Sequence, residues 1–242
     1  MGTTNTITMN NLIFRQLQDP ESHTYTYILG DVDAKEGVLI DSVSEQTDRD
    51  LQLLQELGLR PKLILETHVH ADHITGAWKL RQQTGANIAL SKSSCIDMAD
   101  QLLGDGETIY IGAIPVKTIA TPGHTKSCMS FLFDNKVLTG DTLLIRATGR
   151  CDFQEGSAEQ LYDSITNKLF TLPDPTLVYP AHDYRGFTSS SIGEEKRFNQ
   201  RIGGGKSKEE FVAIMNSLNL AYPKKMDIAV PANLRCGSTD IL

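Results

Sequence analysis

The sequence predicts an α/β protein in which strands and helices alternate in two halves. Short runs rich in aromatic and β-branched residues alternate with segments that have helical spacing of apolar residues and end in glycine. The chain has 242 residues, a length at which α/β folds often remain undivided, and no segment resembles a linker between domains. Hydrophobic residues make up 40% and charged residues 22%, as in ordinary folded proteins. We therefore expect residues 1–242 to form one domain.

The first half is expected to open with antiparallel strands and to continue as a β-α-β unit. Asp48 is placed to cap a helix, which Gly58 and Pro61 end, and Gly85 is placed to end the next helix. The predicted elements are strands at Thr24–Leu29 and Gly37–Asp41, a helix from Asp48 to Leu57, a strand at Lys62–Leu65, a helix at Ile74–Thr84 and a strand at Asn87–Leu90.

The second half repeats the alternation with more strands. A flexible run of three glycines, Gly203–Gly205, precedes the last predicted helix. The predicted elements are strands at Thr108–Tyr110, Ile114–Ala120, Ser127–Phe133 and Lys136–Thr139, a helix at Ala158–Phe170, a strand at Thr176–Tyr179 and a helix at Glu209–Leu218.

Charge and hydropathy exclude several classes of partner. The formal net charge of -7 argues against nucleic acid and anionic lipid, because proteins that bind them concentrate Lys and Arg. No apolar run approaches the roughly 20 residues that span a bilayer. The opening Met1–Asn11 is polar, and no arginine precedes Arg15, so neither a signal nor a transit peptide is expected. We expect a bacterial cytoplasm, or the mitochondrial matrix if a transit peptide has been removed from this chain.

The histidines are concentrated in three short motifs. Five of the six histidines fall in H-V-H-A-D-H, T-P-G-H-T and P-A-H-D-Y, and only His23 lies outside them. The first motif follows the apolar run L-I-L, so it lies where a strand ends, which is the edge at which α/β folds bind ligands. Imidazole nitrogens and carboxylate oxygens are natural donors for zinc or iron. The pattern predicts a metal site built from His68, His70, Asp72, His73, His124, Asp141 and His182.

Two of these residues have an alternative role when each is taken alone. Asp141 follows Gly140, so a turn or helix-capping role fits it as well as metal ligation does. For His182, a hydrogen bond with a ligand residue competes with direct binding of the metal. Asp141 and His182 are assigned to the site because they occur together with the other motifs.

Four motifs, in this order, resemble those of the metallo-β-lactamase superfamily: T-H-V-H-A-D-H, T-P-G-H-T, T-G-D-T-L and P-A-H-D-Y. This resemblance implies an αβ/βα sandwich of two mixed β-sheets flanked by helices. Within the superfamily, further segments resemble the persulfide dioxygenases, also called sulfur dioxygenases, across nearly the whole chain. These segments are Y-T-Y-I-L-G-D, L-L-I-R-A-T-G-R-C-D-F-Q-E-G, Y-P-A-H-D-Y-R-G-F and V-P-A-N-L-R-C-G.

The resemblance implies an iron enzyme of sulfide detoxification. Such enzymes oxidise glutathione persulfide with O2 to sulfite and glutathione at a mononuclear non-heme Fe(II), one per subunit, and form homodimers. Carried over to this chain, the iron ligands fall on His68, His124 and Asp141, which form a two-histidine, one-carboxylate triad. The remaining residues of the set are expected to surround the ligands, orient them and move protons; these are His70, Asp72, His73 and His182.

For the glutathione moiety the resemblance points to Arg150, Tyr184 and Arg235. An arginine fork suits the peptide carboxylates, although a structural ion pair is an equal alternative for either arginine. The chain departs from the family at Cys151, where threonine is more usual, and in a longer glycine-rich segment. Cys151 is interpreted as a packing residue or a reactive thiol, and the role of Cys236 is left open.

Several competing functions use the same residues or the same fold. The main alternative is a dizinc thioester hydrolase of the glyoxalase II type, because the second-metal residues Asp72, His73 and His182 are present. The sequence around G-R-C-D-F and P-A-H-D-Y favours the dioxygenase. A β-lactamase is disfavoured by the missing secretion signal, and a nuclease by the acidic charge. A protein that only binds partners is expected to have lost ligand residues, and all seven are intact.

Overall fold

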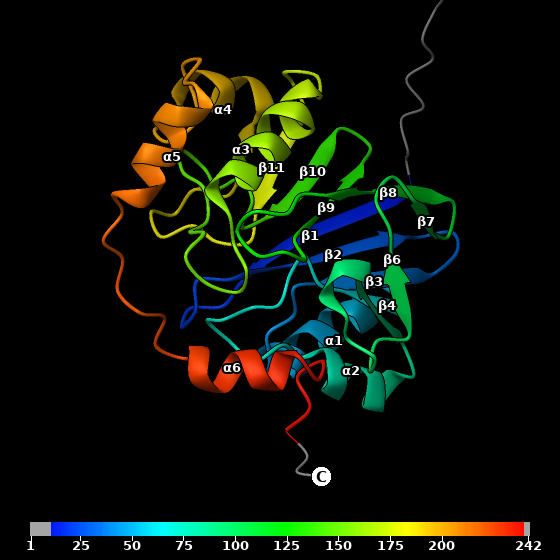
Figure 1. Cartoon of the computed structure of the whole chain (residues 1–242). Coiled ribbons are helices and arrows are strands. Elements are labelled where there is room, and N and C mark those ends of the chain that lie inside the picture. Colours follow the sequence, from blue (N-terminus) through cyan, green and yellow to red (C-terminus); the bar gives the residue numbers. More distant parts are fainter. Residues whose placement is uncertain (1–10, 240–242) are drawn as a thin grey trace, which may run out of the picture.

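Two six-stranded sheets face one another, and helices cover the outer face of each sheet (Figure 1). The computed structural model describes residues 11–239, so the polar opening Met1–Asn11 lies outside the described residues except for Asn11. The first sheet is antiparallel from β1 to β3 and parallel from β3 to β6. Its strands, in spatial order, are β1 (Leu12–Gln18), β2 (Tyr25–Asp31), β3 (Glu36–Ile40), β4 (Arg60–Leu65), β5 (Asn87–Ser91) and β6 (Gln101–Leu103).

The second sheet is antiparallel except for one pair of strands. Strands β10 and β11 run parallel, because the chain crosses over through a helix between them. In spatial order the strands are β12 (Ser190–Ser191), β11 (Leu177–Pro180), β10 (Lys136–Gly140), β9 (Met129–Phe133), β8 (Ile114–Ala120) and β7 (Thr108–Ile111). Both sheets are therefore mixed, as the resemblance implied.

Three helices lie on each outer face (Figure 1). The first sheet is covered by α1 (Thr47–Glu56), α2 (Ala77–Thr84) and α6 (Met226–Asn233), and the second by α3 (Ala158–Asn167), α4 (Ile192–Phe198) and α5 (Lys208–Asn216). Each helix buries an apolar stripe against its sheet, for example Leu54 of α1 and Leu161 of α3. The predicted α/β fold, an αβ/βα sandwich, is confirmed.

The central core lies between the two sheets. Tyr27 and Leu29 of β2 face Phe131 and Phe133 of β9 there, and each of these side chains is almost fully buried. Burial of one such side chain stabilises the fold by about 1.5–3 kcal/mol, so this layer holds the two halves together. Because both halves belong to one core, loops from either half can meet at the edge of the sandwich.

Two predicted helix starts differ from the structure. Asp48 does not cap α1, because a 3-10 turn at Ser44–Gln46 runs directly into the helix and places Asp48 in its first turn. Helix α2 begins at Ala77 rather than Ile74, because Thr75 is held elsewhere by the side chain of Asn233. The predicted end at Gly85 is confirmed by its left-handed backbone, with φ 73°.

Several elements were not predicted from the sequence. These are β1, β6, β12, α4 and α6. Helix α6 contains Pro231, a residue that normally disfavours a helix interior. The helix is stabilised by tertiary contacts, such as that of Val230 with the apolar residues between the first sheet and its helices. No helix among residues 11–239 has the length and apolar character needed to cross a membrane.

Candidate metal centre

The predicted site residues lie at one edge of the sandwich, just after the ends of strands. His68 follows β4, His124 follows β8, Asp141 follows β10 and His182 follows β11. Gly140, at φ 53°, turns the chain at the end of β10, and a Cβ atom there would lie 2.6 Å from the Thr67 Oγ1 atom. Only glycine fits this close approach, which brings the loops of the two sheets together.

His68, His124 and Asp141 form a group that we call the open cluster. One ligand atom from each residue lies within 4.8 Å of the others. His124 Nε2 and Asp141 Oδ2 are 3.7 Å apart, and the rings of His68 and His124 meet edge to face at 4.9 Å between centroids. The ligand atoms are therefore close to one another without a hydrogen bond between His124 and Asp141.

Hydrogen bonds behind the open cluster decide which atoms face its centre. The Thr67 hydroxyl donates its single proton to Asp41 Oδ2, so it can only accept from His68 Nδ1, at 2.9 Å. His124 Nδ1 lies 2.6 Å from the Arg150 carbonyl oxygen, which can only accept. Each neutral imidazole therefore carries its proton on Nδ1 and keeps the Nε2 lone pair free for a metal.

Electrostatics favour the metal-binding protonation states of His68 and Asp141. Burial lowers the pKa of His68 well below its ordinary value, and the neighbouring histidines act in the same direction. Burial alone would raise the pKa of Asp141, but His182, His124 and His68 outweigh it and lower the pKa. A neutral imidazole and an ionised carboxylate are the forms that bind metal.

The donor set fits a metal ion with open coordination positions. The set consists of two imidazole nitrogens and one carboxylate oxygen, and the protein holds the other polar atom of each side chain. Non-heme Fe(II) oxygenases use this arrangement. The same donors also suit zinc. The geometry thus supports a metal centre at His68, His124 and Asp141.

Asp72, His73 and His182 form a second group together with Thr24, which the sequence analysis did not single out. Asp72 Oδ2 lies 2.9 Å from each of Thr24 Oγ1, His73 Nδ1 and His182 Nε2. Burial would raise the pKa of Asp72, but His182 and His73 hold it well below its usual range. Since hydrogen bonds join these four side chains directly, we call them the closed cluster.

His182 connects the two clusters. Its Nδ1 atom lies 2.7 Å from Asp141 Oδ1, while its Nε2 atom faces Asp72. Burial lowers the pKa of His182, but the two carboxylates more than offset this and raise it well above the ordinary value. His182 therefore holds Asp141 in place. This geometry agrees with the alternative that His182 forms a hydrogen bond with a metal-ligating residue instead of binding the metal.

His70 faces acidic residues rather than solvent. Its Nε2 atom lies 3.2 Å from Asp41 Oδ1 and 3.3 Å from Glu66 Oε2, within ion-pair range but outside hydrogen-bond geometry. Burial would lower the pKa of His70, yet Asp41 and Glu66 raise it to about 10. The ring also contacts that of His68 at 4.1 Å between centroids, so His70 lies directly beside the open cluster.

Residues far apart in the sequence support the metal-binding loop. The Asn233 amide donates to the carbonyl oxygens of His70 and His73, and its oxygen accepts from the Thr75 N–H. Asn233 is buried at the end of α6. Nothing in the local sequence marks it, apart from its place in the P-A-N-L-R-C-G segment that carries the family resemblance.

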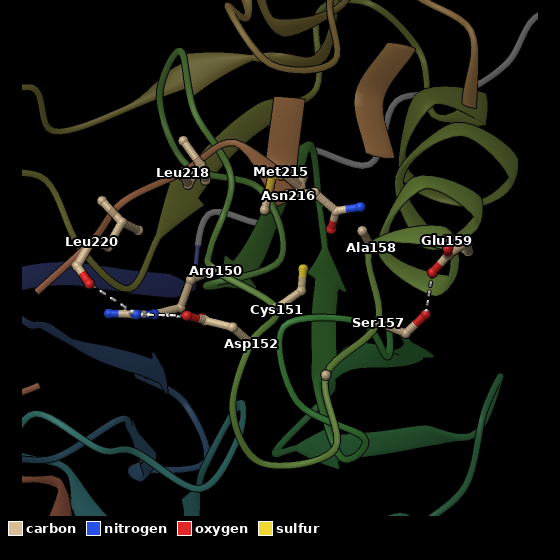
Figure 2. A pocket seen from close by; sticks show the side chains of 11 residues that line it. Arg150, Cys151, Asp152, Ser157, Ala158, Glu159, Met215, Asn216, Leu218 and Leu220 are labelled. Carbon is tan, nitrogen blue, oxygen red and sulfur yellow. Dashed lines mark hydrogen bonds and ion pairs between the residues drawn. The ribbon is translucent and has the colours of Figure 1, made fainter. Parts of the chain in front are cut away.

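Arg150 lines a cavity of about 540 Å³, whose lining includes none of the open-cluster residues, and its carbonyl oxygen contacts His124. Its guanidinium forms two bonds of 2.7 Å with Asp152 and a third with the Ala221 carbonyl oxygen. Figure 2 shows the side chain directed toward Asp152 and Leu220. The structural ion pair that the sequence left open as an alternative is thus formed in this structure.

Tyr184 and Arg235 are not among the residues that line this cavity. The Tyr184 ring stacks on His182 at 6.0 Å between centroids and is 67% exposed, so it is accessible to a ligand. Arg235 is half-buried and follows α6. Cys151 does line the cavity, and burial raises the pKa of its thiol to about 12.

Comparison with known proteins agrees with the fold and the site. The model of the metallo-β-lactamase superfamily matches residues 19–182. The human mitochondrial persulfide dioxygenase ETHE1 is 48% identical over 229 residues, which cover 93% of this chain and 89% of the human protein. The crystal structure of ETHE1 from Myxococcus xanthus is 53% identical, with a TM-score of 0.91, and covers 93% of this chain and 100% of that one.

A more distant solved structure, in a di-iron-bound form, is 25% identical with a TM-score of 0.64 and covers 77% of this chain and 98% of that one. The resemblance seen in the sequence is confirmed at both levels. This chain belongs to the ETHE1 persulfide dioxygenase family of the metallo-β-lactamase superfamily.

Proposed function

We propose that this protein is a persulfide dioxygenase that oxidises glutathione persulfide with O2 to sulfite and glutathione at one Fe(II) per subunit. The observation that carries the proposal is the open cluster, in which His68, His124 and Asp141 each keep one ligand atom free. Two histidines and one carboxylate leave room on the ion for both substrates. When bound, Fe(II) supplies the redox chemistry that activates O2 toward the outer sulfur.

The surrounding residues have two tasks in this proposal. His182 and Thr67 hold Asp141 and His68 in their ligand orientations, as hydrogen-bond partners of metal ligands commonly do. Oxidation of a persulfide to a thiol and sulfite also consumes one water and releases protons. Asp72 and His73, joined to His182 by hydrogen bonds, give those protons a route away from the reacting sulfur. His70 adjoins His68 and completes this group.

The glutathione moiety is proposed to bind on the surface around the open cluster. Tyr184 offers an exposed ring next to His182, and Arg150 adjoins His124 through its main chain. Arg150 is already paired with Asp152, so it would contact the substrate by exchanging or sharing that partner. Arg235 completes the proposed set, as the family resemblance implies.

The proposal is tested by measuring O2 uptake and sulfite release with glutathione persulfide. Fe(II)-loaded wild-type protein is expected to consume O2, and His124→Ala is expected to lose both the activity and the metal. S-lactoylglutathione hydrolysis, measured with iron- and zinc-loaded protein, tests the hydrolase alternative in parallel. Thioester hydrolysis without O2 uptake would contradict the dioxygenase and favour a dizinc hydrolase.

Domain organisation, assembly and compartment remain predictions. We expect residues 1–242 to fold as one domain and to form a homodimer, which light scattering during gel filtration would measure. A bacterial cytoplasm is the expected location, with the mitochondrial matrix as the alternative if a transit peptide has been removed. Fractionation of the source cells with an antibody against this chain would distinguish the two.

A further inference from the structure

We propose that the Thr24 hydroxyl restricts this site to a single metal ion by tying Asp72, His73 and His182 to one another. This inference goes beyond the proposed reaction and rests only on its assignment of a metal to the open cluster. A relative with the same fold holds two irons, so the fold itself permits a second ion. Asp72 and His73 of the closed cluster belong, together with His70, to a second group whose ligand atoms lie within 4.8 Å of one another, so these side chains could serve such an ion.

The distances show that Thr24 is the common contact of the closed cluster. Its Oγ1 atom lies 2.9 Å from Asp72 Oδ2, 3.2 Å from His73 Nδ1 and 3.1 Å from His182 Nε2. Thr24, His73 and His182 are buried, so water can reach these contacts only from the side of Asp72, whose side chain is 28% exposed. One hydroxyl therefore contacts a polar atom of all three side chains.

The spacing of these atoms suits hydrogen bonds and not a shared ion. Ligand atoms at about 2.0–2.1 Å from a tetrahedral ion lie about 3.3–3.4 Å apart. Asp72 Oδ2 is only 2.9 Å from both His73 Nδ1 and His182 Nε2. An ion bound by Asp72 and His182 must therefore separate them and displace the proton that lies between them.

Thr24 is itself held in place from two directions. An isolated β-bridge pairs its main chain with that of His182, and the next residue, Tyr25, donates its N–H to the Ala181 carbonyl oxygen. Its hydroxyl also lies 2.8 Å from Ser22 Oγ, which is 2.8 Å from Asp19 Oδ2. The hydroxyl cannot turn away from Asp72 without breaking these contacts.

In the open cluster the equivalent hydrogen bonds act behind the ligands instead of between them. His124 Nε2 and Asp141 Oδ2 stand 3.7 Å apart, near the spacing that a shared ion requires. Thr67 contacts the Nδ1 face of His68 and leaves the opposite nitrogen free. Thr24, by contrast, contacts Asp72 Oδ2 and His182 Nε2 at once, and in the closed cluster His73 Nε2 is the nitrogen left without a hydrogen bond. Thr67 therefore prepares one position for a metal, and Thr24 occupies two of the ligand atoms at the other.

The experiment counts metal ions in the wild type, Thr24→Val, Thr24→Ser and Thr118→Ala. Valine keeps the size of the side chain and removes the hydroxyl, whereas serine keeps the hydroxyl. Thr118 is an equally buried threonine that donates only to main-chain oxygens of Gly104 and Glu107, so it is the control. Each protein is loaded anaerobically with Fe(II) or, separately, with Zn²⁺. Elemental analysis gives the metal-to-protein ratio, and chelator competition gives the affinity for each successive ion.

We expect one ion per chain in the wild type, Thr24→Ser and Thr118→Ala. Thr24→Val is expected to bind a second ion at least about tenfold more tightly than the wild type, which moves its ratio toward two. An unchanged second-ion affinity in Thr24→Val, or two tightly bound ions in the wild type, would overturn the inference. If the wild type bound no ion, the assignment of a metal to the open cluster would also be wrong. A failure of the Thr24 inference can therefore be distinguished from a failure of the metal assignment.

Discussion

The two clusters at the edge of the sandwich contain the same kinds of side chains but present them differently. In the open cluster, His68 Nδ1 donates to the Thr67 hydroxyl, which donates to Asp41, and His124 Nδ1 donates to the Arg150 carbonyl oxygen, so these bonds lie on the outer faces of the ligands. In the closed cluster, the bonds run between the would-be ligands themselves. The difference teaches that residue type alone does not make a metal site, because the direction of the supporting hydrogen bonds decides which atoms remain free.

Removal of a ligand charge from the open cluster should have the largest effect. Asp141→Asn keeps the shape of the side chain but removes the carboxylate, so we expect metal affinity to fall on the order of 100-fold or more and O2 uptake to be lost. Chelator competition measures the affinity. Asp105→Asn, which disturbs an exposed ion pair with Lys168, is the control and should bind metal normally. Normal metal binding by Asp141→Asn would mean that the open cluster is not the metal centre.

Loss of the hydroxyl behind His68 should weaken the open cluster less severely. Thr67→Val removes the acceptor that keeps the His68 proton on Nδ1, and we expect metal affinity to fall about 10- to 100-fold. Thr67→Ser restores the hydroxyl and should recover most of the loss. If valine and serine behave alike at this position, the proposed orientation of His68 by Thr67 is wrong.

Asn233 supports the main chain of the loop that carries His70 and His73, so its loss should appear first as lower stability. Asn233→Ala leaves the buried carbonyl oxygens of His70 and His73 and the Thr75 N–H without their partner. We expect the free energy of unfolding to fall by about 1–3 kcal/mol. Urea denaturation measures it, with exposed Asn219→Ala as the matched control. Equal stability of the two variants would show that α6 does not hold the metal-binding loop.

The smallest effect concerns the thiols of Cys151 and Cys236. Burial raises the pKa of Cys151, beside the cavity, and of Cys236, beneath α2, to about 12 each. At pH 8 only about one thiol in ten thousand is then ionised, so both should react with iodoacetamide much more slowly than the exposed Cys95. Half-buried Cys151 should react before Cys236 as the pH rises, and mass spectrometry can follow each site. Rapid labelling of Cys151 at pH 7 would instead identify it as a reactive thiol.

The same pKa shifts predict a loss of stability at high pH. Unfolded thiols ionise near pH 8.5, whereas the folded ones keep their protons to about pH 12. The folded state therefore binds more protons in this range, and the free energy of unfolding should fall as the pH rises above about 8.5. Cys151→Ala should show a smaller fall than the wild type between pH 8 and pH 10. An identical pH profile in the two proteins would contradict this account.

Most of the fold was predictable because its signals are local. Apolar runs such as Leu63–Leu65 and the glycine after α2 mark strands and helix ends within a few residues. The late start of α2 and the presence of α6 were not predictable in this way, because both depend on Asn233 contacting a loop that lies about 160 positions earlier. Pro231 even argues locally against the helix that the structure contains.

The sequence by itself determined the family, the donor types and the order of the motifs, because each motif is a short run of residues next to a strand end. Only the tertiary structure decided that Arg150 is paired with Asp152, that Thr67 leaves one face of His68 free, and that Thr24 closes the cluster around Asp72. Thr24 and His182 are separated by 158 positions, and Asp41 and Thr67 by 26. The physical reason is that a hydrogen bond depends on distance and direction in space, which a single sequence does not contain for residues so far apart.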